Sequence, residues 1–345
     1  MRTGTGLSFS VLVDRGMSIS DADYRGAPIG WKSQTGDVGP SYYDPDGPEW
    51  LRGFFGGLLT TCGLTWAGAA TVDEGVELGL HGRGSSLPAE VLAASGDWVG
   101  DKYVIRVEGK VREARVFGPN MVLARKITTE LGSNKITIQD SITNEGWNPS
   151  PLMVLYHFNF GFPLLDDGAR FVSTSTRYVP RDQDAWEGHE EFHRFGPPER
   201  AFREKVYFHD LAVDGEGFAH AGITNEGFDG GRGLGVSLKF KKEQLGRMIE
   251  WKMVGEGEYV VGVEPANCLV MGRDTERKWG TLETLDPSET KQVDIELSVL
   301  TCVEDIEEYE KTVRSVMSGR TSALVKDVDE FVRTTSRGFP RWEGT

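Results

Sequence analysis

A histidine and a carboxamide stand two residues apart in a strongly aromatic segment. The segment 156–160 reads Tyr-His-Phe-Asn-Phe and follows the apolar stretch 151–155. Side chains of a β-strand alternate between its faces, so we expect His157 and Asn159 to share one face. An imidazole ringed by aromatic residues suits proton transfer to a small polar ligand such as a sugar. The alternative interpretation is a hydrogen-bonded histidine of the core.

A second histidine lies among glycines earlier in the chain. Residues 78–84 read Leu-Gly-Leu-His-Gly-Arg-Gly. The flanking glycines expose the ring of His81 and let the backbone approach a ligand closely, and Arg83 adds a rigid fork of donors. The segment therefore indicates ligand binding, although an ordinary surface loop could also carry such a histidine.

A carboxylate near the end of the chain completes a set of groups for acid–base chemistry. Residues 260–265 read Val-Val-Gly-Val-Glu-Pro, so Glu264 ends an apolar strand just before a proline. Partial burial of a carboxyl raises its pKa toward the range that is useful for a general base. The alternative is a glutamate that meets water or an arginine at the strand end.

The elements that must position these groups are mostly β-strands. Alternating segments separated by Gly and Asn turns predict an all-β protein, as a sandwich or a barrel. The turn 131–134, Leu-Gly-Ser-Asn, predicts a hairpin. The expected strands are 102–107, 121–129, 135–142, 234–240, 259–264 and 293–300.

The C-terminal part of the chain changes to a helical pattern. Apolar residues recur at spacings of three and four between 306 and 316 and again between 325 and 332, which predicts two helices packed on the β body or on a partner subunit. We therefore expect a β-sandwich domain over residues 1–303 and a short helical extension over residues 304–345. The segments 34–51 and 181–200 are expected to be long loops that bind ligand.

Composition excludes several classes of function. The 345 residues carry a formal net charge of −15, which disfavours nucleic acid and anionic membranes as partners. Cys62, Cys268 and Cys302 are widely spaced and odd in number, which predicts reduced thiols rather than a disulfide framework or a structural zinc site. No segment has the roughly 20 apolar residues of a membrane helix, and the start of the chain does not resemble a signal peptide. We expect a cytoplasmic protein.

At the three candidate sites the chain resembles the aldose 1-epimerase (galactose mutarotase) superfamily. That superfamily has a Leu-His-Gly motif, then a His-x-x-Asn-like segment after a strand, then a Glu-Pro-like segment. The corresponding segments of this chain follow in the same order, at residues 80–82, 157–159 and 264–265. The resemblance extends over residues 7–300. Among the superfamily, the chain looks like a bacterial branch distinct from the well-studied enzymes.

The resemblance implies both a fold and a reaction. The fold is a large antiparallel β-sandwich, the galactose mutarotase-like supersandwich, with an open cleft for a sugar. The reaction is cofactor-free interconversion of sugar anomers on a monosaccharide or sugar derivative, with no metal. His157 would be the general acid on the ring oxygen, Glu264 the general base on the anomeric hydroxyl, and His81 would hold the substrate with help from Arg83.

Further substrate-binding residues are expected around these groups. Asn159 shares the strand of His157, and Arg15, Arg52 or Arg83 could replace an early arginine of the superfamily. The sugar-binding aspartate of the superfamily has no clear match, and only position favours Asp210 or Asp214. The aromatic residues that could stack on a sugar ring are Trp251, Trp66, Tyr156 and Phe158.

Three other functions stay open from the sequence. Residues 189–193 read His-Glu-Glu-Phe-His and match the zinc-protease pattern, although prolines follow too soon for a long helix. His81, His157 and Glu264 could instead form a site with two histidines and one carboxylate for a metal-dependent sugar enzyme. A non-catalytic sugar-binding or sensing protein can use the same fold. The sequence names neither the sugar nor the oligomeric state, and a homo-oligomer is possible.

Overall fold

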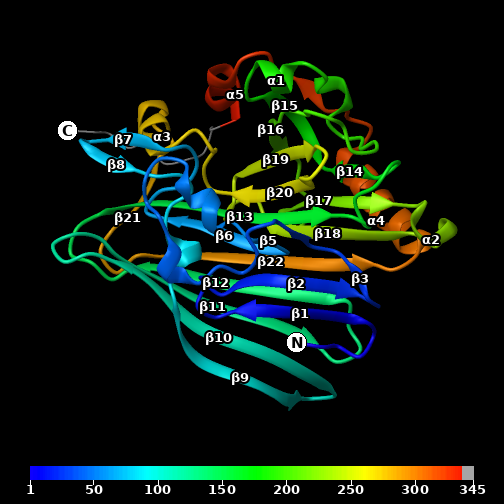
Figure 1. Cartoon of the computed structure of the whole chain (residues 1–345), viewed down its shortest axis with the longest axis horizontal. Coiled ribbons are helices and arrows are strands. Elements are labelled where there is room, and N and C mark those ends of the chain that lie inside the picture. Colours follow the sequence, from blue (N-terminus) through cyan, green and yellow to red (C-terminus); the bar gives the residue numbers. More distant parts are fainter. Residues whose placement is uncertain (336–345) are drawn as a thin grey trace.

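The computed structural model describes residues 1–335, which form two large β-sheets packed face to face (Figure 1). Nearly all pairings are antiparallel; β15 and β23 form a parallel one. In spatial order the first sheet contains β1 (Leu7–Leu12), β2 (Ser18–Tyr24), β6 (Leu59–Leu64), β13 (Ser150–Gly161), β20 (Tyr259–Ala266), β19 (Arg247–Val254), β16 (Lys205–Leu211), β15 (Ser175–Pro180) and β23 (Ala323–Leu324), with β3 (Ala27–Pro28) and β21 (Glu283–Leu285) paired beside it.

The second sheet contains the long strands that the sequence predicts most clearly. In spatial order it has β14 (Arg170–Ser173), β17 (Phe218–Asn225), β18 (Leu234–Lys241), β22 (Thr290–Leu300), β12 (Lys135–Asn144), β11 (Asn120–Glu130), β10 (Lys102–Ala114) and β9 (Ala89–Val99). Two small ribbons lie outside the large sheets: β4 (Trp31–Lys32) with β5 (Gly56–Gly57), and β7 (Thr71–Asp73) with β8 (Val76–Leu78). The predicted β-sandwich and the hairpin between β11 and β12 are confirmed.

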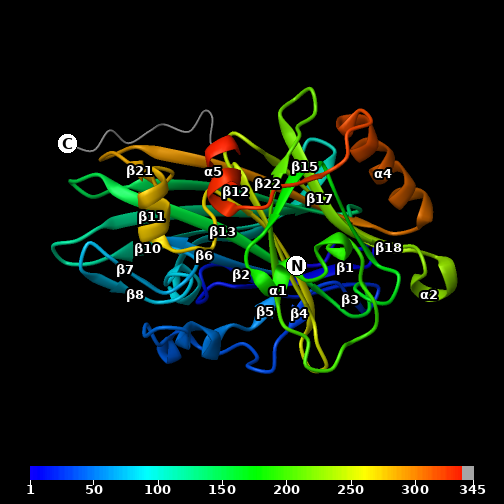
Figure 2. The same cartoon turned by 90° about the horizontal axis from the view of Figure 1, so that it is seen from above.

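Helices are short and lie at the periphery (Figure 2). They are α1 (Gln183–Trp186), α2 (Phe228–Gly231), α3 (Arg273–Trp279), α4 (Val303–Met317) and α5 (Val328–Thr335), with 3-10 turns η1 (Pro40–Tyr42), η2 (Glu49–Gly53), η3 (Gly84–Ser86) and η4 (His189–Glu191).

Both predicted C-terminal helices form, at different places. Helix α4 packs against β14, β18 and β22, whereas α5 packs against β15 and α3. A separate helical extension over residues 304–345 stays a prediction, and residues 336–345 of it lie outside the described part of the chain.

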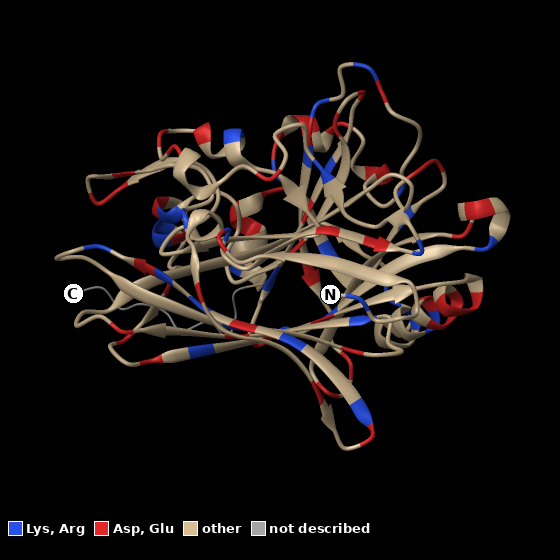
Figure 3. Ribbon diagram, turned by 60° about the horizontal axis from the view of Figure 1, so that its bottom comes forward, with Lys and Arg blue, Asp and Glu red and all other residues tan. Residues whose placement is uncertain are grey.

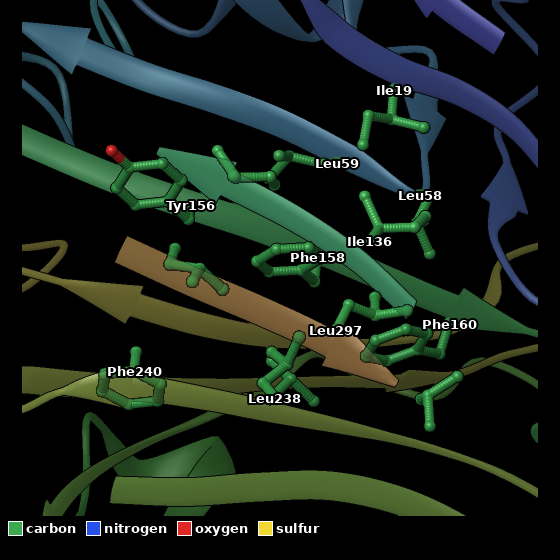
Figure 4. Close-up of a cluster of buried hydrophobic side chains, with 14 of the residues drawn as sticks. Ile19, Leu58, Leu59, Ile136, Tyr156, Phe158, Phe160, Leu238, Phe240 and Leu297 are labelled. Carbon is green, nitrogen blue, oxygen red and sulfur yellow. The ribbon is translucent and has the colours of Figure 1, made fainter. Parts of the chain in front are cut away.

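The main core lies between the two sheets and follows from side-chain alternation. On β13, Tyr156, Phe158 and Phe160 point into this core, where they meet residues of the second sheet such as Leu238 and Leu297 (Figure 4). The intervening residues of β13, including His157, consequently point to the opposite face of the first sheet. Apolar loop residues cover that face as well, so β13 is buried on both sides.

A buried ion pair links the two sheets directly behind this strand. Arg125 on β11 and Asp140 on β12 are neighbours in register, and Nε of Arg125 donates to Oδ1 of Asp140 at 2.9 Å. Tyr156 donates its hydroxyl to Oδ2 of Asp140 at 2.6 Å, and Nη1 of Arg125 donates to the Thr61 hydroxyl at 2.8 Å. The network therefore ties β6 and β13 of the first sheet to β11 and β12 of the second.

The charged residues and the cysteines show no unusual grouping. Acidic and basic residues are interspersed along the strands and loops (Figure 3). The three cysteines are free thiols, with Cys62 and Cys268 buried. Within residues 1–335, no helix combines the length and the apolar character needed to cross a bilayer.

Candidate active site

A hollow of about 200 Å³ opens on the face of the first sheet that points away from the main core. This volume lies below the roughly 300–1,000 Å³ of sites for drug-sized ligands, so it suits a ligand of about one sugar ring. Its walls include the apolar side chains of Phe54, Val206 and Ile249. Its polar lining consists of His81, His157, Arg181, Glu204, Trp251 and Glu264.

The register of two neighbouring strands brings the two catalytic candidates, His157 and Glu264, together. Strands β13 and β20 are antiparallel, and Phe158 pairs with Val263. One residue along each strand, His157 and Glu264 therefore lie side by side on the face of the hollow. Gly262 leaves room for them, because a Cβ atom there would meet both the Glu264 carboxylate and the His157 ring.

His157 and Glu264 form a close buried pair with unused hydrogen-bonding capacity. Nε2 of His157 lies 3.1 Å from Oε1 of Glu264, and both side chains are almost fully buried. The contact lacks hydrogen-bond alignment, and neither Oε1 of Glu264 nor Nδ1 of His157 has a hydrogen-bond partner among the described residues. Buried polar atoms without partners are rare in folded proteins, so these atoms indicate a place where a polar ligand binds.

Burial favours the uncharged form of each group in the empty hollow. It raises the pKa of the Glu264 carboxyl well above its usual value, and the nearby Glu204 adds to this shift. It lowers the pKa of the His157 imidazole well below its usual value, and His81 acts in the same direction. Without a ligand, burial therefore favours a protonated Glu264 beside a neutral His157.

His81 reaches the hollow from a tight turn. Its backbone is in the left-handed region, with φ of 56°, and its N–H donates to the Gly68 carbonyl at 2.8 Å. The ring of His81 lies 6.0 Å from that of His157 and 4.7 Å from that of Trp50, measured between centroids. Burial lowers the pKa of His81 to about 4, so at neutral pH its ring is an uncharged hydrogen-bonding group.

Trp251 and two charged residues form the rim of the hollow. The Trp251 ring lies 5.4 Å from the His157 ring, and its indole N–H donates to Oε2 of Glu204 at 2.8 Å. Arg181 donates to Oε1 of the same glutamate at 2.9 Å. The arginine and the glutamate together fix the indole as a wall of the hollow.

Sequence reasoning missed Arg181 and Glu204 as site residues. The available signal was the long loop 181–200, which was predicted to bind ligand and which begins at Arg181. Neither Asp210 nor Asp214, the aspartates favoured by position, lines the hollow. Asp210 pairs with Arg177 and Lys242, and Asp214 pairs with His220. Glu204 supplies the further carboxylate at the hollow.

Comparisons with known proteins identify the family. A family profile described as a domain of unknown function (DUF4432) matches residues 1–299. The chain belongs to this family. A search of the curated proteins found no match.

Solved structures place this DUF4432 chain among the galactose mutarotase-like folds. A Klebsiella pneumoniae protein named as a candidate aldose 1-epimerase has 25% identity and a TM-score of 0.86, covering 94% of this chain and 84% of its own. A galactose mutarotase-like protein from Clostridium acetobutylicum has 14% identity and a TM-score of 0.56, covering 86% and 93%. A galactose 1-epimerase from Lactobacillus acidophilus has 12% identity and a TM-score of 0.55, covering 86% and 92%. The last two show the fold alone, and the predicted resemblance is confirmed at that level.

Three predicted binding residues of the DUF4432 chain do not reach the hollow. Arg15 is buried and donates to the carbonyls of Val38, Gly53 and Ser85, so it connects three loops. Arg83 lies over the rings of Tyr43 and Trp66. Asn159 is fully buried behind His157, and its side chain donates to the Gly56 and His157 carbonyls.

The aromatic candidates divide between the hollow and the core. Trp251 lines the hollow, whereas Tyr156 and Phe158 point into the core between the sheets. The indole N–H of Trp66 donates to the Gly79 carbonyl at 2.8 Å, and its ring lies outside the hollow. Trp50 and Phe54, in the loop 34–51 and just after it, are walls that sequence reasoning did not single out.

The zinc-protease pattern of the DUF4432 chain does not form the helix that it needs. His189 lies in the 3-10 turn η4, where Nδ1 of its ring is 3.1 Å from the Tyr178 hydroxyl, and the chain turns away before His193. Two histidines one turn apart on a stable helix are required for that metal site. Within residues 1–335, no group of three or more His, Cys, Asp or Glu side chains is arranged to hold a metal ion.

A larger depression of about 1,020 Å³ lies elsewhere, between Arg115 and Trp147. It contains no histidine, and the glutamates that line it, Glu74 and Glu145, are exposed. Both carboxylates already pair with arginines, Glu74 with Arg277 at 3.2 Å and Glu145 with Arg112 at 2.7 Å. The small hollow is therefore the candidate for chemistry.

Proposed function

We propose that this protein interconverts the anomers of a sugar, as an aldose 1-epimerase does. The observation that carries the proposal is the His157–Glu264 pair at the floor of a ring-sized hollow, with polar atoms that no group within residues 1–335 satisfies. His81 and Trp251 supply a hydrogen-bonding group and an aromatic wall beside the pair. The names of the structural neighbours support the same reaction.

The chemistry needs one proton donor and one proton acceptor within reach of adjacent oxygens. The acceptor removes the proton from the anomeric hydroxyl, the bond between C1 and the ring oxygen breaks, and the donor protonates that oxygen. Rotation about the C1–C2 bond and the reverse transfers then close the ring on the other face. The anomeric and ring oxygens are bonded to the same carbon, so two side chains 3.1 Å apart can serve both.

The roles of the two groups follow from where the proton resides. With His157 as acid and Glu264 as base, the pair must be charged, with imidazolium beside carboxylate. Burial favours the opposite distribution, with Glu264 protonated and His157 neutral. Ring opening leaves the proton on the residue that acted as acceptor, and ring closure returns it to the residue that acted as donor. The neutral pair and the charged pair therefore both occur within one full cycle. Hydroxyls of the bound sugar stabilise the charged one.

Polarimetry on freshly dissolved pure anomers tests the proposal. We expect the protein to accelerate mutarotation of at least one sugar in a broad panel above the buffer rate. Rates equal to buffer for every sugar, together with measurable binding of one of them by calorimetry, would instead support a non-catalytic sugar-binding protein.

The pair also predicts how turnover depends on pH. It becomes doubly protonated only when His157 gains a proton, and the lowered pKa of His157 moves that event below the usual imidazole value of about 6.5. It loses its one proton only when Glu264 ionises, and the raised pKa moves that event above the usual carboxyl value of about 4.3. We therefore expect the acid-side decline of kcat/KM to be centred below pH 6.5 and the alkaline-side decline to be centred above pH 4.3. An acid-side decline already centred at 6.5 would contradict this assignment.

A further inference from the structure

A second depression, here called the groove, adjoins the hollow. It has a volume of about 820 Å³ and is lined by residues of α1, of α3 and of the start of α5, which lie on the same side of the molecule (Figures 1 and 2). Arg181 lines both the hollow and the groove, and the consecutive residues Val270 and Met271 line one each. The groove is therefore an outward continuation of the candidate active site.

One apolar cluster contributes to the walls of both depressions. Phe54, Val206 and Ile249 of the hollow belong to this buried cluster, and Met271 and Trp279 of the groove pack against it. A ligand that fills the hollow and extends outward would keep contact with a continuous surface. This continuity is expected of one extended binding site rather than of two separate ones.

Two tryptophans give the groove the character of a sugar site. Trp186 and Trp279 are half-buried on its walls. The indole N–H of Trp279 donates to Oδ1 of Asp329 at 2.6 Å, which fixes the orientation of the ring. An indole offers a broad apolar face while hydroxyls of a ligand bond to polar groups at its edge. Thr275 and Gln183 are such polar groups in this groove.

The charges of the groove favour an uncharged ligand. Its cationic side chains, Arg181, Lys278 and Lys326, are offset by the carboxylates of Asp182, Asp327 and Asp329. Arg181 already pairs with Asp182 and Glu204, and Lys278 pairs with Asp274 at 2.7 Å. A site for phosphate would instead gather cations around one point.

We infer that the substrate is a neutral reducing disaccharide or longer oligosaccharide. Its reducing-end ring occupies the hollow with the anomeric carbon at His157 and Glu264, and its next ring lies in the groove between Trp186 and Trp279. The hollow alone has room for about one ring, so the remainder of the ligand leaves past Arg181. This inference rests on the proposed function of the hollow.

The test compares sugars and variants in the same mutarotation assay. Wild-type protein is assayed with glucose and galactose and with maltose, cellobiose and lactose. We expect the preferred disaccharide to have a kcat/KM at least tenfold above that of its own reducing-end monosaccharide. Trp279→Ala is expected to remove most of this advantage by raising KM for the disaccharide, with a much smaller change in KM for the monosaccharide. Trp186→Ala serves as a second variant if Trp279→Ala folds poorly.

A matched control and a binding measurement make the outcome decisive. Trp98→Ala removes a largely exposed tryptophan of β9, which belongs to the other sheet. This variant is expected to leave kcat/KM unchanged for both monosaccharides and disaccharides. Equal kcat/KM for monosaccharides and disaccharides, or an equal loss for both in Trp279→Ala, would overturn the inference. If no sugar is turned over, calorimetry still tests the groove, because tighter binding of a disaccharide that depends on Trp279 supports it. Tighter binding of glucose 6-phosphate than of any disaccharide would overturn it.

Discussion

Replacement of His157 by alanine is expected to lower kcat for mutarotation by on the order of a hundredfold or more while the fold persists. Positioned proton transfer contributes about 10²–10⁴-fold to enzymatic rates, and the imidazole of His157 is one of two titratable groups in contact at the floor of the hollow. The side chain lies on the face of β13 opposite the main core, so its removal leaves the packing between the sheets intact. Polarimetry gives kcat, and circular dichroism reports the fold.

Glu264→Gln should produce a loss of similar size, because the amide keeps the shape of the carboxyl and cannot exchange the proton. Combined with His157→Ala it should cost little more than either change alone, since the two groups act as one unit. His220→Ala is the matched control, because His220 lies on β17 outside the hollow, where it pairs with Asp214. Additive losses in the double variant, or a loss below about tenfold in either single variant, would show that the pair does not transfer the proton.

The strands of the second sheet were predictable from local patterns. Strands β10, β11 and β12 have one buried and one more exposed face, so apolar and polar residues alternate along them. Strand β13 was harder to interpret, since it is buried on both faces and its sequence is almost continuously apolar. There the alternation of Tyr156, His157 and Phe158 still separated the core face from the face of the hollow.

Two of the site residues were predictable because residue type and strand position agreed, and His81 because glycines flank it in a tight turn. His157 and Glu264 stand on neighbouring central strands, and the register that joins them follows from the sheet. Arg83 was predicted as a ligand group from the glycine-rich segment around His81, and Arg15 as a replacement for an arginine of the superfamily. In the structure Arg15 donates to loop carbonyls and Arg83 lies over aromatic rings. Glu204 could not be foreseen, because its place beside Trp251 depends on how the loop before β16 returns to the sheet.

Asp140→Ala is expected to lower the free energy of unfolding by about 3–5 kcal/mol, the usual cost of removing one partner of a buried ion pair. The side chains of Arg125 and Asp140 are both completely buried. Without the carboxylate, the guanidinium keeps its bond to Thr61 but loses its counter-charge, and the Tyr156 hydroxyl loses its acceptor. Such a loss is a large part of the roughly 5–15 kcal/mol that stabilises a typical domain. Urea unfolding followed by circular dichroism measures it.

Glu130→Ala is the matched control for this prediction, since Glu130 lies on β11, the strand of Arg125, and pairs with Lys102 at 3.0 Å in an exposed position. Solvent screens such a pair, so its removal should cost at most about 1 kcal/mol. A loss below about 1 kcal/mol for Asp140→Ala as well would mean that water or a rearranged side chain compensates Arg125. The ion pair would then add little to the apolar packing and the backbone hydrogen bonds that already hold β13. Because Tyr156 adjoins His157 in the same strand, a large loss would instead show that the ion pair behind the sheet stabilises the strand that carries the candidate catalytic histidine.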